Sequence, residues 1–279
     1  MKNILIPTDF SENAWNAVDY ALQFFSKTPC NIYLLHVNKP DVVFGSENLF
    51  TSNKINSSNI LVKPSKQQLQ ELLNRVKKNF PNNSNQNFFI ISDTNYIIDS
   101  IRKQVLERKI HLIVMGTKGN SGLKNFCIGS NAGNVITKVK CTTMVVPENA
   151  RFIATKEIAF PTDFSIFYQA ETLQPLVDIV EMFNATVRVL HVNKSSSELN
   201  EDQQRNKEYL DDYFANYNHS YEFLTNKFFE DAVQKFVDTK EINLITMLAK
   251  NLNYFQKILF HPTIKGISYY KDIPFLVLH

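Results

Sequence analysis

The chain repeats itself, so its architecture must be one that can be built twice from a single sequence. Three short motifs occur in the same order in both halves: ILIPTDFS at 4–11 and IAFPTDFS at 158–165, LHVNK at 35–39 and 190–194, and LIVM at 112–115 and LITM at 244–247. Similar motifs kept in order over such distances indicate an internal duplication. We therefore expect two copies of one domain.

Short apolar runs alternate with longer helical patterns within each copy. Runs such as IYLL at 32–35 are apolar on both faces, which is typical of parallel strands covered by helices on both sides. The alternation predicts an α/β fold with two tandem doubly wound domains and right-handed crossovers. The strands are expected at 3–6, 31–37, 88–92, 111–116 and 143–146, and near 157–160, 186–192, 220–224, 243–248 and 275–278. Helices of the first copy are expected at about 12–26, 66–79, 96–108 and 130–139.

The length of 279 residues fits two domains of about 150 residues each. The boundaries are predicted as a first domain at 1–147, a short linker at 148–155 and a second domain at 156–279. A hydrophobic content of 44% with 20% charged residues suits a packed core. No apolar run approaches the ~20 residues that span a bilayer. No secretory signal is visible, and the three cysteines lack zinc-like spacing, so we expect a cytoplasmic protein without membrane contact.

Charge is distributed unevenly between the two copies. Residues 1–150 contain 17 basic and 10 acidic residues, a net charge of +7, whereas residues 151–279 contain 13 and 17, a net charge of −4. A basic half can attract a polyphosphate ligand. No arginine-rich stripe interleaved with aromatic residues and no nucleic-acid-binding motif is present, so we expect no nucleic-acid partner.

Glycines gather in one segment: five of the seven fall between 116 and 133. Glycine serves where the backbone takes a positive φ or approaches a ligand closely. The cluster starts at the end of a predicted strand and leads into a helix, with Ser130 as the expected N-cap. A helix start suits a phosphate, and Lys118 and Lys124 would add positive charge. The alternative is a plain surface loop with turn glycines.

Two common phosphate motifs do not describe this segment. The chain has no G-x-x-x-x-G-K-[ST] sequence, so a P-loop is excluded. The G-x-G-x-x-G fingerprint of dinucleotide-binding folds belongs in the first strand-to-helix turn, which here reads PTDFS at 7–11. The predicted phosphate loop follows the fourth strand instead.

The glycine spacing resembles a known signature. GTKG at 116–119, then nine residues, then GS at 129–130 matches G-x2-G-x9-G-[ST], the ATP-binding pattern of the universal stress protein family. PTDFS and LHV are also similar to the ends of that family's first and second strands. The resemblance covers both copies and implies five-stranded parallel sheets of order 3-2-1-4-5. In that order, strands 1 and 4 are neighbours at the switch point where such sheets bind ligands.

The resemblance also implies roles for single residues. Asp9 and the backbone of Pro7 and Thr8 would face the adenosine, the main chain of Val37 would meet the adenine, and Gly116 would lie near the ribose. The phosphates would be held in the glycine loop. The full predicted nucleotide-binding set is Pro7, Thr8, Asp9, Val37, Met115, Gly116, Lys118, Gly119, Gly129, Ser130 and Asn131.

Other interpretations of two residues remain open. Asp9 can serve as a turn or capping carboxylate for the next helix, although Ser11 is another candidate cap. His36 fits core packing at a strand end better than ligand binding. The expected ligand is ATP, ADP or AMP, with any Mg²⁺ carried by the phosphates rather than by a protein cage. Neither a catalytic residue nor a metal-ligating residue is assigned.

The second copy has lost the glycine pattern. Leu248, Asn251, His261 and Pro262 stand where the first copy has its four signature residues. Pro262 has no N–H to offer a phosphate. We therefore expect one nucleotide per chain, bound in the first domain. The persistence of Asp163 indicates that the opening turn also has a structural use. A different ligand contacted by Lys250 or His261 is the alternative.

The last strands of the two copies and an insertion in the first copy suggest contacts between parts of the protein. The last strands of the copies, at 143–146 and 275–278, are short and apolar, so pairing them would hide two exposed edges in an intramolecular pseudo-dimer. A homodimer of whole chains is also possible. The first copy carries an insertion at 39–66, which is either a lid over the nucleotide or an arm packed elsewhere.

These features favour a nucleotide-binding stress-response or signalling module with at most slow ATP hydrolysis. The sequence shows no paired carboxylates, no nucleophile with a base and no arginine finger near the motif. The second hypothesis is an adenylate-forming or nucleotide-hydrolysing enzyme of the wider adenine-nucleotide hydrolase-like group. Such enzymes usually carry a Ser-Gly-Gly-rich loop after the first strand, which this chain lacks. A third hypothesis, a pure interaction scaffold, suits only the second copy.

Overall fold

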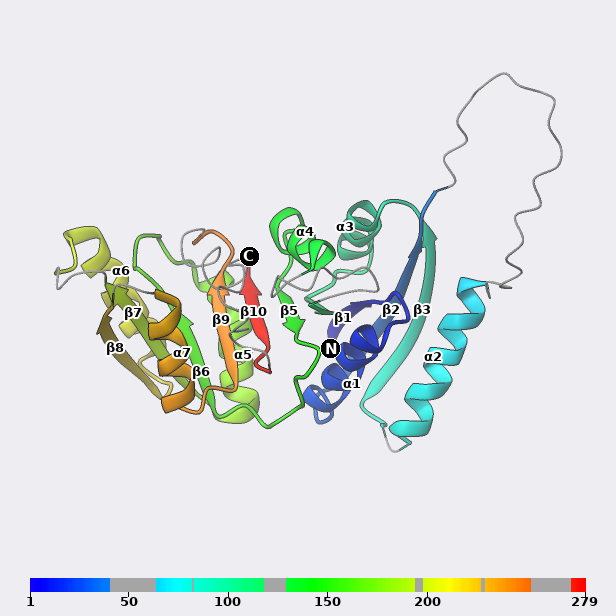
Figure 1. Ribbon diagram of the computed structural model, residues 1–279, viewed down its shortest axis with the longest axis horizontal. Helices are drawn as coiled ribbons and strands as arrows, with labels where there is room; N and C mark the ends of the chain where they lie inside the picture. The colour runs from blue at the N-terminus through cyan, green and yellow to red at the C-terminus, as the bar shows by residue number, and fades with distance from the viewer. Residues whose placement is uncertain (41–63, 82, 118–128, 194–197, 227–228, 252–271) are drawn as a thin grey trace, which may run out of the picture.

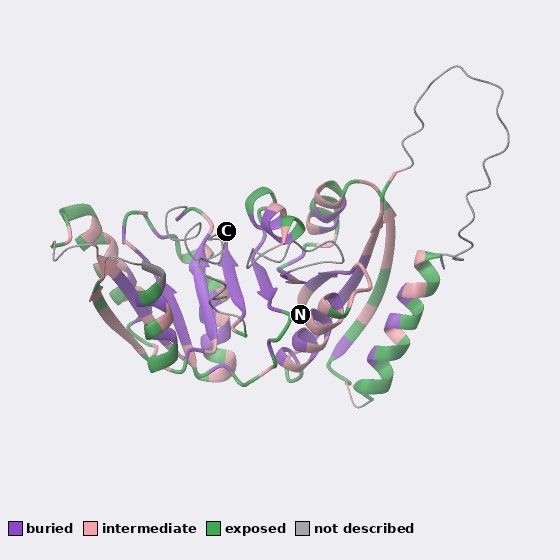
Figure 2. Ribbon diagram, viewed as in Figure 1, coloured by how far each residue is buried: buried purple, intermediate pink, exposed green. Residues whose placement is uncertain are grey.

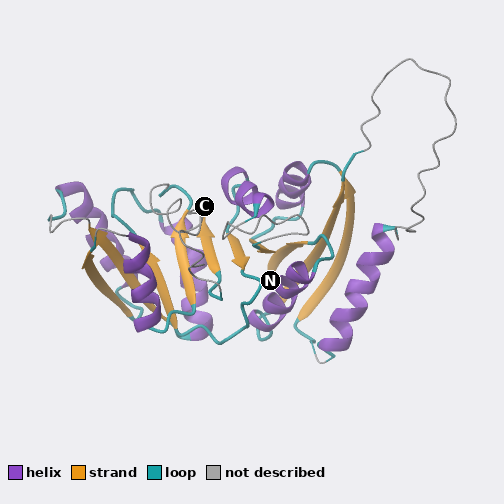
Figure 3. Ribbon diagram, viewed as in Figure 1, coloured by secondary structure: helices purple, strands orange, loops and turns teal. Residues whose placement is uncertain are grey.

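The computed structural model describes residues 1–40, 64–81, 83–117, 129–193, 198–226, 229–251 and 272–279 (Figure 1). Strands and helices alternate through both copies (Figure 3). The strands are β1 Lys2–Pro7, β2 Cys30–Asn38, β3 Gln86–Thr94, β4 Leu112–Gly116, β5 Thr143–Val146, β6 Glu157–Pro161, β7 Thr186–Asn193, β8 His219–Thr225, β9 Leu244–Leu248 and β10 Phe275–Leu278. The helices are α1 Glu12–Phe24, α2 Ser65–Asn79, α3 Ile97–Glu107, α4 Ser130–Lys138, α5 Ala170–Phe183, α6 Glu201–Phe214 and α7 Phe229–Thr239.

All the described strands form one sheet. Its order is β3-β2-β1-β4-β5-β10-β9-β6-β7-β8, so each copy contributes five strands in the order 3-2-1-4-5. Within each copy the paired strands are parallel. The predicted α/β class and strand order are therefore confirmed.

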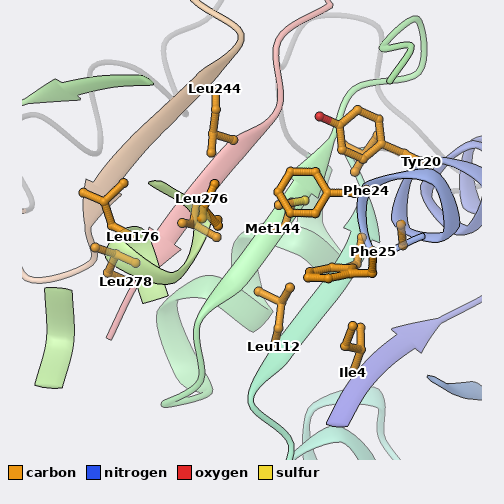
Figure 4. Packing of buried hydrophobic residues seen from close by; sticks show 14 of the residues in the cluster. Ile4, Tyr20, Phe24, Phe25, Leu112, Met144, Leu176, Leu244, Leu276 and Leu278 are labelled. Atoms are coloured by element: carbon orange, nitrogen blue, oxygen red, sulfur yellow. The ribbon is translucent and has the colours of Figure 1, made fainter. Parts of the chain in front are cut away.

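The two copies are joined in the sheet by their last strands. β5 and β10 pair antiparallel, with Met144 opposite Leu276. Both strands are buried along their whole length, and Figure 4 shows the two side chains side by side. This is the pairing expected for the two last strands, and it leaves β3 and β8 at the ends of the sheet.

Helices cover both faces of the sheet, because alternate side chains of each strand point to opposite sides. Ile4 and Ile6 enter a core cluster with α1, α2, α5 and α6, whereas Leu5 enters a second cluster with α3, α4 and α7. The first cluster continues without a break from one copy into the other. Figure 2 shows the central strands as the most buried part of the molecule.

The segment between the copies is fixed to both of them. The side-chain amide of Asn16 in α1 donates to the carbonyl oxygens of Pro147 at 2.9 Å and Ala150 at 3.1 Å. The ring of Phe152 lies 6.0 Å from Phe24 of α1 and 6.1 Å from Phe183 of α5. The ring of Phe152 in the predicted linker is thus an aromatic wedge that packs between α1 and α5.

Two sequence-based expectations concern other parts of the chain. Most of the insertion at 39–66 lies outside the described residues, so the lid and the arm both stay hypotheses. No helix in the described ranges combines the length and apolar character needed to cross a lipid bilayer.

Candidate nucleotide site

The carboxyl ends of β1, β2 and β4 meet at one edge of the sheet, because these neighbouring strands run parallel. β1 ends at Pro7 and β4 ends at Gly116. The predicted site residues on strand ends are Pro7, Thr8, Asp9, Val37, Met115 and Gly116, and they all lie at this edge. It is the edge at which open α/β sheets bind ligands.

The turn after β1 is held by its own short polar side chains. Phe10 has a positive φ of 64°, and its N–H donates to Thr8 Oγ1 at 3.0 Å. Asp9 Oδ1 accepts from the Ser11 N–H at 3.0 Å and from Ser11 Oγ at 2.6 Å. Ser11 Oγ in turn accepts from the Ala14 N–H, so Ser11 is the N-cap of α1 and Asp9 supports the cap.

His36 braces this turn from β2. Its Nδ1 lies 2.8 Å from the carbonyl oxygen of Thr8, and its ring stacks on Phe10 with the centroids 4.4 Å apart. A carbonyl oxygen only accepts hydrogen bonds, so Nδ1 carries the proton in this contact. These contacts match the packing role expected for His36.

The second copy repeats the same turn almost contact for contact. Phe164 has a φ of 56° and stacks on His191 at 5.2 Å. His191 Nδ1 lies 2.9 Å from the Thr162 carbonyl oxygen, and Asp163 Oδ1 accepts from Ser165 Oγ at 2.7 Å. Because the turn survives where the glycine motif does not, its internal hydrogen bonds serve the fold in both copies.

The two ends of the glycine loop are tied together. The Gly129 N–H donates to the carbonyl oxygen of Thr117, and the Thr117 N–H donates to the Val146 carbonyl oxygen at 3.1 Å. The start of α4 is thus fixed beside the end of β4. Thr117, which is buried, was not among the predicted site residues. Lys118, Gly119 and Lys124 lie outside the described residues.

Gly116 lies against the first turn of α1. A β-carbon at this position would be 3.0 Å from the main-chain oxygen of Asn13 and 3.3 Å from its carbonyl carbon. Backbone packing therefore favours glycine at this position, in addition to the ligand approach expected from the sequence. No pattern in the sequence singled out Asn13.

The N-terminus of α4 lacks a side-chain cap. Its N-cap is Gly129, which has φ −70° and ψ 161° and makes no capping hydrogen bond. The prediction of Ser130 as the cap was wrong, since the extended backbone falls on Gly129 and Ser130 is the first helical residue. No acidic residue occupies the first turn, and Ser130 and Asn131 are exposed. The first N–H groups of this helix have no intrahelical partner and carry its partial positive charge.

In the second copy, side chains stand where the loop glycines would be. Asn251, at the position of Gly119, donates from Nδ2 to Asp163 Oδ1 at 2.9 Å. Gln203 of α6 donates to the Asp163 carbonyl oxygen at 2.7 Å. Leu248, at the position of Gly116, is 4% exposed. His261 and Pro262 lie outside the described residues. Within the described residues, His, Cys, Asp and Glu form no group of three that could hold a metal ion.

Comparison with known proteins agrees with this architecture. Residues 1–147 match the model of the universal stress protein family. The universal stress protein MJ0531 of Methanocaldococcus jannaschii is 29% identical over 151 residues, which are 52% of this chain and 81% of that protein.

Two crystal structures resemble the whole chain. A universal stress protein from Archaeoglobus fulgidus superposes with a TM-score of 0.60 at 16% identity, covering 99% of this chain and 97% of its own. A putative universal stress protein from Pseudomonas aeruginosa gives a TM-score of 0.57 at 12% identity, covering 100% and 93%. At these low sequence identities, the two structures show a similar fold and nothing more about this chain. With the family match over more than half of its length, the chain belongs to the universal stress protein family.

Proposed function

We propose that the first copy binds one adenine nucleotide, ATP or its di- or monophosphate, at the edge where β1 and β4 end. One observation carries the proposal: the start of α4 has no side-chain cap and no acidic first-turn residue, and it is tied to the end of β4 through Thr117 and Gly129. Unpartnered N–H groups at a helix start are a ready site for phosphate oxygens.

The helix starts of the chain are of two kinds. α1 is capped by Ser11, and α6 has a capping box formed by Asn200 and Gln203. α2, α3 and α5 start without a side-chain cap, as α4 does, but α4 is the one whose start follows the glycine loop and is tied to the end of β4. The exposed start of α4, in the half of the chain with a net charge of +7, is suited to an anionic ligand.

Residue roles follow from position at this edge. The N–H groups of Ser130 and Asn131 would bind phosphate oxygens, with Lys118 and Gly119 from the loop completing that part. Asp9 and the main chain of Pro7 and Thr8 would face the adenosine. Val37 and Met115 would line the adenine side, and Gly116 would admit the ribose. Mg²⁺ would arrive on the phosphates, since Asp9 is the only acidic residue of the proposed set.

The second copy would bind no nucleotide. Asn251 and Gln203 donate to Asp163, and so supply hydrogen bonds to the opening turn from within the protein. Leu248 fills the place of Gly116. We therefore propose a stoichiometry of one nucleotide per chain.

The site suits a binding module of a stress or signalling system rather than a fast enzyme. Phosphoryl transfer needs a metal and charges positioned on both sides of the transferred group, and the proposed set offers only Asp9 as an acid. The alternative is an adenylate-forming or nucleotide-hydrolysing enzyme. Turnover of Mg²⁺–ATP above about 1 s⁻¹, the low end of ordinary enzymes, would favour that alternative.

Calorimetric titration with ATP tests the site and its stoichiometry. The purified chain should bind a single equivalent, and native mass spectrometry should show one bound nucleotide. Gly129→Val should weaken binding at least 100-fold, because the backbone at Gly129 suits valine but the side chain would cover the N–H groups of α4. Two equivalents per chain, or unchanged affinity in this variant, would refute the proposal.

The duplicated turn provides a matched control. Asp9→Asn should weaken ATP binding about tenfold or more, because it changes a group at the proposed site. Asp163→Asn makes the same change in the same turn of the second copy and should leave ATP affinity unaltered. Equal loss of ATP affinity in the two variants would show that the effect of Asp9→Asn does not depend on its place at the proposed site, and would contradict the role proposed for Asp9.

A further inference from the structure

The sheet ends in two strands that hold equivalent places in the two copies. β3 closes the sheet on one side and β8 on the other (Figure 1), and each pairs with the second strand of its own copy. The outer backbone groups of an end strand can accept a further strand, so proteins usually guard such strands with charged side chains, prolines or bulges. The two end strands can therefore be compared directly.

β8 carries charged side chains of this kind. Glu222, the fourth of its seven residues, pairs with Lys240 at an N–O distance of 2.6 Å. Nearby on the same strand, Ser220 accepts a hydrogen bond from Arg188 Nη1 at 3.0 Å. A strand added at β8 would have to lie beside these charges, so this end of the sheet is guarded.

β3, which is described along its whole length, has none of these guards. Residues 87–92 read NFFIIS, with no charged residue and no proline. The pairing of β3 with β2 runs unbroken from Gln86 to Thr94, so the strand has no bulge. Phe89 is 43% exposed and Ile90 is 37% exposed, and they point to opposite faces of the sheet. A long apolar end strand of this kind is suited to pairing with another strand.

The sequence of β3 is complementary to itself when two copies of the strand run antiparallel. In the register that places Ile90 opposite Ile90 of a second chain, Phe89 lies opposite Ile91. Asn87 at one end of the pair then lies opposite Asp93 at the other end. Apolar side chains meet in the middle, an amide meets a carboxylate at each end, and no two like charges are opposed.

The other end strand is a poorer partner for β3. Pairing with β8 of another chain would bring the charges of Glu222 and Lys240 beside the apolar middle of β3. Such a head-to-tail contact would also leave an unpaired strand on every assembly, whereas a twofold contact closes into a dimer. The chain already contains an antiparallel join of this kind, in which β5 and β10 pair with Met144 opposite Leu276.

We propose that β3 is a dimerisation edge, which pairs antiparallel with β3 of a second copy of this chain around Ile90. The two ten-stranded sheets then continue into one another, and the partner strand covers the exposed side chains of Phe89 and Ile90. No residue of β3 belongs to the proposed nucleotide-binding set, so either proposal can fail without the other.

Analytical ultracentrifugation of the full chain tests for the dimer. The measured mass should rise toward that of two chains as the concentration is raised to about 200 µM. Ile90→Lys opposes two like charges at the centre of the pair and should weaken association at least tenfold. Phe223→Lys is the matched control, because Phe223 is a 49% exposed residue of β8, and it should leave association unchanged.

The same measurement can overturn the proposal. A chain that stays monomeric at every concentration would do so, and so would an equal loss of association in Ile90→Lys and Phe223→Lys, which would indicate head-to-tail pairing. Far-UV circular dichroism of both variants reports whether they are folded.

A cysteine at the centre of the pair tests the register. Because Cys30 and Cys141 are buried, the background is a chain with Cys127→Ser. Ile90→Cys places two α-carbons about 4.5–5.5 Å apart, within the range of a disulfide, so mild oxidation should give a covalent dimer. Phe89→Cys places them about 8 Å apart, beyond that range, and should give little. No cross-link in Ile90→Cys, or an equal yield in Phe89→Cys, would overturn the proposed pairing.

Discussion

A β-carbon on Gly116 would lie 3.0 Å from the main-chain oxygen of Asn13, so the end of β4 and the first turn of α1 pack tightly around this glycine. The second copy has changed both sides of this contact. Leu248 replaces the glycine, and α5 begins at Ala170, four residues later than the repeat would place it. The second copy therefore lacks the helical turn that corresponds to the one against which Gly116 packs.

Gly116→Ala should destabilise the first copy by about 1–3 kcal/mol, because the added carbon overpacks a rigid backbone contact. Urea unfolding measures the change. Asn13→Ala in the same chain should not restore stability, since the clash is with the main chain of Asn13. Leu248→Ala, the change at the equivalent place, should destabilise through a cavity instead, by about 2–5 kcal/mol. Full stability of Gly116→Ala would contradict the close contact.

Phe152→Ala should destabilise the whole chain by about 2–3 kcal/mol, because it removes a ring packed between α1 and α5. The neighbouring change Ile153→Ala is the control. Ile153 is 66% exposed, so its truncation should stay within about 0.5 kcal/mol. Thermal unfolding of the two variants distinguishes them, and an equal shift in Tm would argue against the aromatic wedge.

The thiols of Cys30 and Cys141 should resist alkylation in the folded protein. Burial raises the pKa of Cys30 to about 11 and that of Cys141 to about 12, so neither forms an appreciable thiolate at pH 8. Iodoacetamide labelling mapped by mass spectrometry should modify neither residue before unfolding and both in 6 M urea. Rapid labelling of Cys141 in the native chain would show that this core opens readily.

The ion pair between Lys2 and Asp178 should link stability to pH across the two copies. Its N–O distance is 2.8 Å. Burial pushes the pKa of Asp178 up, but hydrogen bonds from Lys2 and Gln174 outweigh it, and the pKa lies below its ordinary value. The stabilisation that the ion pair gives the folded chain is therefore complete above the ordinary aspartate pKa of about 4. It is lost as the pH falls through the lowered pKa of Asp178.

Removing one partner of this pair tests the linkage. Asp178→Asn should cost about 0.2–1 kcal/mol at pH 7, as is usual for partly exposed pairs, and almost nothing at pH 2. Urea unfolding of the variant and the original chain at both pH values gives the difference. A loss of stability that is the same at pH 2 and pH 7 would assign the effect to packing rather than to charge.

Much of the fold could be predicted, because the signals for it are local and are repeated. Strands such as Leu112–Gly116 are apolar on both faces, which indicates a parallel strand under two helical layers. The strand order followed from the family resemblance, and edge protection suggested that β5 and β10 would pair.

The details of the site were less accessible from sequence. The contact of Gly116 with Asn13 joins backbones a hundred residues apart, so no local pattern records it. The N-cap of α4 depends on which residue is extended, and both Gly129 and Ser130 are common caps. The sequence showed that Asn251 had replaced a glycine, but its hydrogen bond to Asp163 emerges only when β6 and β9 are brought together.

The antiparallel pairing of β5 with β10 has a consequence for how the protein behaves on dilution. Two separate chains that met through such strands would dissociate as their concentration fell, whereas here a covalent tether keeps one half permanently available to the other. The two halves are also always made in equal number. One half was therefore free to diverge in its surface chemistry without losing the partner that covers its exposed strand.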